Sequence, residues 1–262
     1  MNKRINPVIP AVFLTFLIFQ SCPSYADGTF SLTSGADYST GKYGQSQSTD
    51  ISYVPFTAKY ETDDTTLKLT IPWLQITGPG DVVGGDAKVV LGKSSRPSVT
   101  QSGLGDIVFS ATHTFARIGT THPLILDVTG KIKFATASAS KGLGTGENDY
   151  SILLDAYKPL IKDLTLFGGV GYKLMGDPVG LDLHNVWFGS AGFSYKFSPA
   201  TSAGIMADIR QATLDTTQPL RELTAFAIHK FDDHYKLQSY LTHGYSESST
   251  GWGGGVMLGY VF

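Results

Sequence analysis

Charged side chains occur at every second position in several segments of this sequence. In residues 123–136, Asp127, Lys131 and Lys133 alternate with leucine, valine and isoleucine. Side chains two positions apart share one face of a β-strand, so these groups can form cross-strand ion pairs or contact a charged solute. The candidates for this chemistry are Lys68, Asp106, Asp127, Lys131, Lys133, Asp155, Lys173, Lys196, Asp208 and Arg210.

Two interpretations of these candidates are open. They could line a pore that selects solutes by charge and hydrogen bonding, or they could form ion pairs that brace and fill an enclosed space. Both signs of charge are present among them, which argues against a simple anion filter or a simple cation filter.

Histidine, serine and glycine give no recognisable catalytic or metal-binding pattern. No two histidines on one predicted element have the spacing of zinc ligands, and no serine has a partner-histidine motif. The stretches GLGTGEN and GGVGYK lack the full phosphate-loop pattern and open no helix. We therefore predict no catalytic, cofactor-binding or metal-binding residues. The histidines are His113, His122, His184, His229, His234 and His243.

The composition is unusual for a soluble protein. Only 16% of the 262 residues are charged, against roughly 25% in an average soluble protein. Glycine is frequent, with 30 residues, and the mean hydropathy is +0.01. Beyond the first residues no apolar run approaches the roughly 20 residues of a transmembrane helix, which excludes a helical membrane protein. No basic patch is present, so nucleic acid is not an expected partner.

Residues 1–26 have the pattern of a secretory signal peptide. Lys3 and Arg4 precede an apolar stretch, and small residues lead to a cleavage position after Ala26. The apolar stretch is too short to anchor the chain across a bilayer. Lipoprotein processing at Cys22 is a second alternative, although the residues before it form a poor lipobox.

A mature chain of residues 27–262 would contain no cysteine, which excludes a small disulfide-stabilised extracellular fold. Without Lys3 and Arg4, 18 basic and 22 acidic residues remain, a formal charge of −4.

Period-two alternation with regularly spaced turns predicts an all-β chain of about twelve strands. Their lengths suit a tilted strand crossing a membrane better than a strand of a soluble sheet. The predicted strands are residues 31–41, 49–60, 65–76, 104–116, 123–136, 148–159, 163–175, 185–197, 201–213, 221–231, 235–246 and 251–262.

Short and long connections alternate in strict order between these strands. Short ones such as ETDD and FSPA lie between longer ones such as SASKGLGTGE. An up-and-down barrel of the bacterial outer membrane has tight periplasmic turns, longer outside loops and an even number of strands. We therefore predict a closed antiparallel transmembrane β-barrel over residues 27–262.

Alternation alone does not show which face points inward, because a soluble lipocalin-like barrel would place its apolar face inside. The aromatic residues favour the membrane interpretation. In the predicted topology Trp73, Trp187 and Trp252 fall at the outer rim, and phenylalanines end the downward strands at the inner rim. Two aromatic girdles that flank an apolar band are typical of outer-membrane barrels. The phenylalanines are Phe115, Phe197, Phe231 and Phe262.

Two features should interrupt a regular barrel. Pro55 and Pro72 remove backbone donors from neighbouring strands, so we expect bulges or bends there. The long segment between Gly78 and Gly103 could fold inward as a constriction or remain an outside loop.

Several segments together resemble the outer-membrane β-barrel family of putative meta-pathway phenol degradation proteins. The resemblance covers nearly the whole mature chain, and one departure from it is Ala135, where proline is expected. It implies passage of small, in part aromatic, compounds across the outer membrane and brings no catalytic residues. The segments that carry it are YSTGKYG, VPF with KY, IPWLQITGPG, SGLGDIVFSA, KIKFATA with KGLGTGENDY, GGVGYKLMGDP and GGGVMLGYVF.

These observations predict an outer-membrane channel for passive passage of small aromatic or hydrophobic solutes, with outer-membrane lipid and the solute as partners. Two alternatives stay open: a structural or surface-recognition barrel with a filled lumen, and an outer-membrane hydrolase acting on lipid. The identity of the solute and the oligomeric state are not predicted.

Overall fold

The computed structural model of the chain describes residues 9–11, 15–17, 28–80, 82–83, 89–90 and 97–262. The predicted signal peptide lies outside these residues except for β1 (Ile9–Ala11) and β2 (Thr15–Leu17), which pair as a two-stranded sheet. Its cleavage stays a prediction. Among the described residues, no helix is long and apolar enough to cross a membrane.

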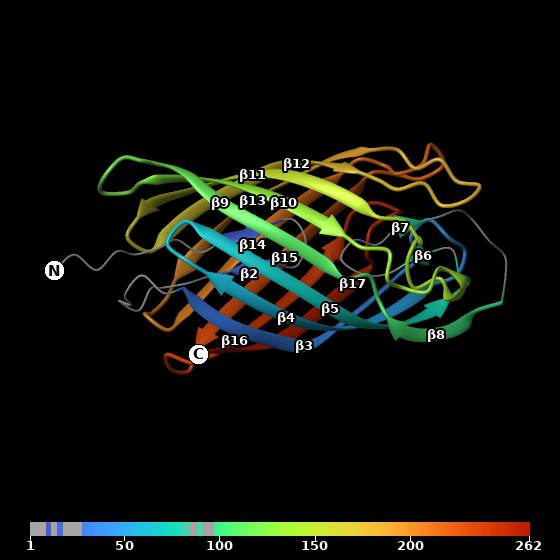
Figure 1. The fold of residues 1–262 in the computed structure, drawn as a ribbon, viewed down its shortest axis with the longest axis horizontal. Helices are drawn as coiled ribbons and strands as arrows, with labels where there is room; N and C mark the ends of the chain where they lie inside the picture. Colours follow the sequence, from blue (N-terminus) through green and yellow to red (C-terminus); the bar gives the residue numbers. More distant parts are fainter. Residues whose placement is uncertain (1–8, 12–14, 18–27, 81, 84–88, 91–96) are drawn as a thin grey trace.

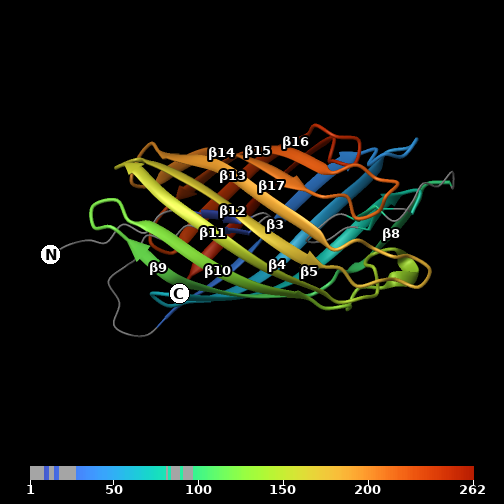
Figure 2. The same cartoon turned by 90° about the horizontal axis from the view of Figure 1, so that it is seen from above.

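The remaining chain forms an elongated barrel of tilted strands (Figures 1 and 2). Every strand pairs antiparallel with its neighbours, and β3 pairs with β17 to close the ring. The predicted closed barrel of twelve strands is confirmed. The twelve places in the ring are filled by thirteen strand segments, because β8 and β9 share one place. The segments are β3 (Thr29–Gly41), β4 (Thr49–Glu61), β5 (Thr65–Gly78), β8 (Val99–Leu104), β9 (Val108–Ile118), β10 (Leu124–Lys133), β11 (Asp149–Ile161), β12 (Leu164–Leu174), β13 (Val186–Lys196), β14 (Thr201–Arg210), β15 (Leu220–Lys230), β16 (Tyr235–Gly244) and β17 (Trp252–Val261).

The predicted strand 104–116 differs from the observed structure. It is replaced by β8 and β9, which pair with successive parts of β5 and occupy one place in the ring. The pairing shifts by one residue between them, and the backbone N–H of Gly105 donates to Pro72 O at 2.9 Å.

The two prolines explain this interruption. Pro55 and Pro72 are direct partners, and the β4–β5 ladder is regular through both, contrary to the expected bulge between them. The ladders on their other sides are interrupted instead: β3 and β4 lack pairs for Gly35 and Ala36, and β5 meets the β8–β9 break. Proline has no backbone N–H to donate, and this costs little free energy where the neighbouring strand is not paired at that position.

Strand β10 ends at Lys133, earlier than predicted. Beyond it the N–H of Ala135 donates to Asn148 Oδ1 at 2.8 Å. A proline, which the family resemblance predicts at this position, has no N–H for this bond. The short 3₁₀-helix η1 (Ala139–Lys141) follows within the same connection.

Apolar side chains cover the outside of the ring. In β11, Ile152 and Leu154 are more than half exposed, whereas Leu153 and Asp155, which alternate with them, are 4% exposed. The same alternation runs through β12 to β17. In a single-layer closed ring the exposed set faces outward, so the exterior is an apolar band and the buried set faces the lumen.

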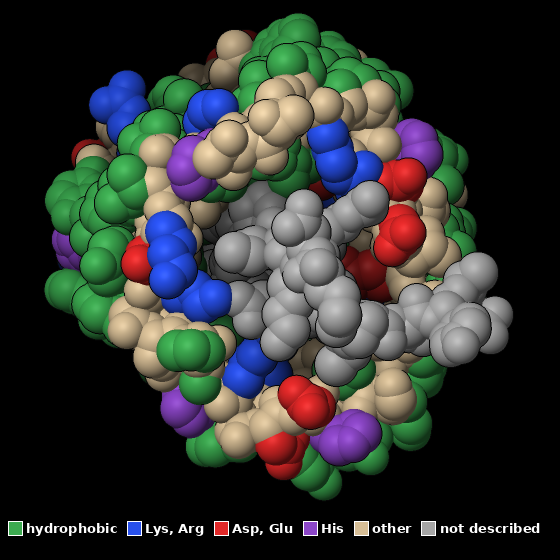
Figure 3. All heavy atoms as spheres, turned by 90° about the vertical axis from the view of Figure 1, so that its left-hand side faces the viewer, with side chains coloured by type: hydrophobic (Ala, Val, Ile, Leu, Met, Phe, Trp, Pro, Cys, Tyr) green, Lys and Arg blue, Asp and Glu red, His purple; other side chains and the backbone are tan. Residues whose placement is uncertain are grey.

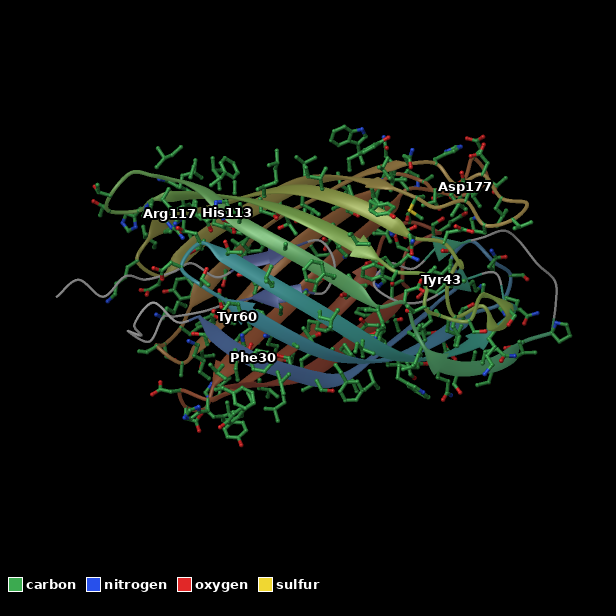
Figure 4. The ribbon with its side chains drawn as sticks, viewed as in Figure 1. Phe30, Tyr43, Tyr60, His113, Arg117 and Asp177 are labelled. Carbon is green, nitrogen blue, oxygen red and sulfur yellow. The ribbon has the colours of Figure 1, made fainter. Side chains whose placement is uncertain are left out.

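The short turns gather at one end of the barrel and the long loops at the other. At the short-turn end Arg117 contacts the carboxylate of Asp64 in the neighbouring turn and donates to Asp63 O at 2.9 Å (Figure 4). Asp232 accepts backbone N–H groups from Tyr235 and His234, and these bonds lower the pKa of its carboxyl below the ordinary value. These contacts fix the short turns locally.

The last residue closes the ring. The backbone N–H of Phe262 donates to Phe30 O at 3.0 Å, and the two rings lie 5.4 Å apart between centroids. The predicted position of Phe262 beside the first barrel strand is therefore observed.

Replacing Phe262 with aspartate should reduce the folded fraction of the barrel. The change removes a ring contact worth about 0.5–1.5 kcal/mol and places a charge at the apolar edge of the closing strands. The folded fraction can be measured as unheated, fast-migrating protein on SDS gels. Phe262→Tyr, which keeps the ring, should behave like the wild type; equal folding of all three proteins would contradict the closing role.

Candidate functional site

The loops at the long-loop end fold inward over the barrel mouth. Val82 and Val83, in the segment between Gly78 and Gly103, are 1% and 2% exposed. Val82 packs against Leu74 and Ile76, which are inward-facing residues of β5. Strand β6 (Val82–Val83) pairs with β7 (Val89–Val90). Of the two options for this segment, its described part takes the inward one.

A second contact holds this cover in place. Val83 packs with Met175 and Leu183 from the β12–β13 connection, and Leu214 lies against them. The cover is thus an apolar lid built from separate loops. The Val82 cluster consists of Tyr43, Ile51, Leu74, Ile76, Val82, Ala137 and Leu143.

A buried ion network lies beneath the β10–β11 connection. Lys133 Nζ donates to Asp106 Oδ2 at 2.7 Å and to Glu147 O at 2.8 Å. Asp149 joins Lys133 to Lys173, at 3.7 Å and 2.8 Å respectively. We call Asp106, Lys133, Asp149 and Lys173 the mouth network.

The carboxylate of Asp106 also fixes the connection itself. Its Oδ1 accepts the backbone N–H groups of Thr136 at 3.1 Å and Ala137 at 2.9 Å. One carboxylate therefore holds an ammonium group and two backbone donors, which satisfies most of its capacity as an acceptor. The arrangement braces the loop that follows β10.

The middle of the lumen wall is apolar, which the sequence analysis did not predict. Inward-facing apolar side chains of β10 to β12 and of β14 to β17 form one contact cluster, which we call the apolar belt. Every member is at most 8% exposed. Its residues are Ile125, Tyr157, Phe167, Met206, Phe226, Ile228, Tyr240 and Met257.

Glycines on neighbouring strands seat the rings of the belt. A Cβ on Gly192 would lie 2.6 Å from the ring of Phe167, and one on Gly204 would lie 2.5 Å from the ring of Phe226. The rings therefore lie against the wall. The centroids of Phe167 and Phe226 are 6.3 Å apart with the planes tilted by 49°.

Lysines gather at the short-turn end. Lys59 is the direct partner of Lys68 across β4 and β5, and Lys230 is the partner of Lys236 across β15 and β16. Lys59 also forms an ion pair with Glu61 at 2.8 Å. We call these four lysines the lysine group. In Figure 3, which looks into the short-turn end, basic side chains lie along part of the rim of the opening and acidic side chains along another part.

Carboxylates oppose each other across neighbouring strands of the lumen wall. Asp127 and Asp155 are direct partners, and so are Asp208 and Glu222. Within the described part of the chain, Asp127 Oδ1 and Asp208 Oδ1 have no hydrogen-bond partner. We call these four residues the carboxylate row, because one line of register partners joins them: Asp127, Asp155, Gly169, Ser190, Asp208 and Glu222.

The structure separates the predicted candidates by position. Asp106, Lys133 and Lys173 join the mouth network, Asp127, Asp155 and Asp208 join the carboxylate row, and Lys68 joins the lysine group. Three candidates lie outside these groups: Lys131 between Ser110 and Ser151, Lys196 opposite Ser202, and Arg210 opposite Phe188.

Five charged members of these groups were not among the residues predicted from the sequence. Lys236 begins an alternating polar series in β16, and Lys59 continues one in β4, so alternation could have identified both. The others stand at strand ends, where alternation is hard to judge. The missed residues are Lys59, Asp149, Glu222, Lys230 and Lys236.

No group of three or more histidine, cysteine, aspartate or glutamate side chains among the described residues could hold a metal ion. The described lumen offers apolar contact, ring contact and charge. Such groups can bind and orient a small solute.

Comparisons with known proteins agree on the fold. No family model and no curated protein matches the chain. An outer-membrane channel from Pseudomonas putida F1 matches with a TM-score of 0.68 and 15% identity, over 91% of this chain and 97% of that one. The NanC porin matches with a TM-score of 0.55 and 8% identity, over 88% and 98%.

A third structure limits what the fold alone implies. The translocator domain of the autotransporter NalP from Neisseria meningitidis matches with a TM-score of 0.51 and 16% identity, over 90% of this chain and 89% of that one. None of the three is named as an enzyme, yet their roles differ. The closed ring, its apolar exterior and these similarities make this chain a bacterial outer-membrane β-barrel with the fold of channels.

Proposed function

We propose that the protein is a passive outer-membrane channel for small solutes that carry an aromatic or hydrophobic part. The observation that carries this proposal is the apolar belt inside the closed ring. The lumen of a general porin is polar and filled with water. A wall of aromatic and aliphatic side chains instead offers contact to an apolar solute at about 25 cal/mol per Å² of buried surface.

The position of the belt also suits transport. On β15 the belt residues Phe226 and Ile228 lie between Glu222 and Lys230, so charged side chains flank the apolar surface on both sides. A solute can then pass from one weak binding contact to the next along the lumen. Passage requires that the solute bind no single contact too tightly. The resemblance to the meta-pathway phenol degradation family supports aromatic compounds as the finer solute class.

A second candidate function is favoured by the same belt. Its side chains are almost fully buried, as in a barrel whose lumen is filled and whose outer loops bind a partner. A filled barrel would pass neither ions nor solutes. The lipid-acting hydrolase gains no support from the described residues.

Phe226→Ala should lower the preference of the channel for aromatic solutes. In liposomes that contain the purified barrel, swelling rates can be compared for phenyl β-glucoside and methyl β-glucoside, two neutral solutes that cross lipid slowly. Loss of one ring contact of about 0.5–1.5 kcal/mol should reduce the ratio of the two rates by roughly two- to tenfold.

Phe193→Ala is the matched control, because Phe193 is an outward-facing phenylalanine of β13 that is 42% exposed. It should leave the ratio unchanged. Absence of swelling with either solute would favour the filled barrel, and equal ratios for wild type and Phe226→Ala would exclude the belt as the selective surface.

A further inference from the structure

The lysine group is held together by the closure of the ring, although its members come from distant parts of the sequence. Between Lys236 on β16 and Lys59 on β4, strands β17 and β3 contribute no charged side chain to the lumen face, where Gly259, Val261, Ser31 and Thr33 lie. The ammonium groups of Lys59 and Lys230 are within electrostatic range of Lys236. The four lysines therefore share one concave part of the wall.

Positive charge dominates this part of the wall. Among the charged groups that act on Lys59 are Lys68 and Glu61, and among those that act on Lys236 are Lys59, Lys230 and Glu61. Lys59 and Lys236 are 4% and 7% exposed. Ammonium groups gathered away from bulk water repel each other, and an anion that enters among them relieves this repulsion.

The apolar belt begins immediately beside these lysines. On β15, Ile228 lies two residues from Lys230 on the same face, and Phe226 lies two residues further. On β16, Tyr240 lies four residues from Lys236. Two residues span about 7 Å along a strand, which is close to the length of a benzoate ion. A carboxylate at the lysines would therefore place its ring on the belt.

Two members of the carboxylate row fix the direction of such a solute. Asp208 and Glu222 lie on the long-loop side of the belt, on β14 and β15. They repel a carboxylate that points toward the long-loop end. The favoured orientation directs the ring toward the long-loop end and the carboxylate toward the short turns.

We propose that the lysine group and the adjoining part of the apolar belt form a binding site for small aromatic carboxylates. This inference rests on the proposed function as a channel for apolar solutes, and it assigns a charge to the preferred solute. The ammonium groups of Lys59 and Lys236 bind the carboxylate, and Phe226 and Ile228 contact the ring.

Direct binding tests this site without requiring transport. The purified barrel in detergent is titrated with benzoate, with its neutral analogue benzamide and with acetate, and binding is followed by ligand-observed NMR. Benzoate is expected to bind at least tenfold more tightly than either of the others. Equal affinity for benzoate and benzamide would overturn the role of the lysines, and equal affinity for benzoate and acetate would overturn the role of the belt.

Variants separate this site from general charge effects. The double variant Lys59→Gln/Lys236→Gln should weaken benzoate binding at least tenfold and leave benzamide binding unchanged. Lys162→Gln removes the same charge from the exposed β11–β12 turn and should change neither. If the double variant does not fold, Lys230→Gln, at a half-buried position, should still weaken benzoate binding several-fold. Unchanged benzoate binding in a folded lysine variant would overturn the proposal.

The glucoside swelling assay keeps the two proposals distinct. The double lysine variant should pass phenyl β-glucoside at the wild-type rate, because that solute carries no charge. Benzoate binding without any swelling would contradict the channel and leave the site standing. Swelling without a preference for benzoate would contradict the site and leave the channel standing.

Discussion

Replacing Asp106 with alanine is expected to destabilise the mouth of the barrel and to raise the ionic conductance of the channel. The change removes the acceptor of the Lys133 ammonium and of two backbone N–H groups at Thr136 and Ala137. Breaking one partner of a buried ion pair typically costs about 3–5 kcal/mol. The connection after β10 should then leave the mouth, because its backbone donors find partners in water.

Conductance in planar bilayers and thermal unfolding in detergent both measure this effect. Asp106→Asn keeps an acceptor for the backbone donors but loses the charge, so its effect should be intermediate. Asp182→Ala is the control, since Asp182 lies exposed in another loop at the same end. If Asp106→Ala and Asp182→Ala behave alike, the mouth network does not brace the cover.

Much of the fold could be predicted because a membrane barrel imposes one simple rule on each strand. Hydrocarbon on one side requires apolar side chains at every second position, and β10 obeys this rule from Leu124 to Ile132. The same rule places the last barrel strand beside the first. An apolar side chain such as Phe262 is favourable there only where another apolar group contacts it.

The break between β8 and β9 could not be predicted from alternation. It depends on which strand lies beside Pro72, and that neighbour is known only once the register is fixed. A glycine at position 105, followed by Asp106, was the available signal, but glycine occurs throughout this chain. The charge of Asp106 is used by a loop more than 25 residues away, which no local pattern reveals.

The apolar belt was missed for a related reason. Strand β15 is apolar on both faces, with Ala225 and Ala227 outward and Phe226 and Ile228 inward, so alternation does not distinguish its sides. If every apolar side chain is assigned to the lipid-facing side, no aromatic side chains remain for the lumen wall. The lysine group depends on long-range closure as well, because β17 must meet β3 before Lys236 and Lys59 become neighbours.

The second large effect is expected from the lid over the mouth. The double variant Val82→Asp/Val83→Asp places two carboxylates among the apolar contacts of Leu74, Met175 and Leu183. A charge without a partner in such surroundings is too costly to bury, so the segment should move into water rather than remain docked. The strands of the barrel make no use of these contacts in their ladders, and the ring should stay closed.

Single-channel conductance should therefore increase several-fold while the folded fraction on SDS gels stays close to that of the wild type. Val179→Asp is the matched control, because Val179 is fully exposed in the β12–β13 connection and the same substitution there buries no charge. An unchanged conductance in the double variant would indicate that the constriction lies at the apolar belt and not at the lid. In that case Phe226→Ala, and not the lid, should widen the path for ions, because the belt is the next surface that a solute meets.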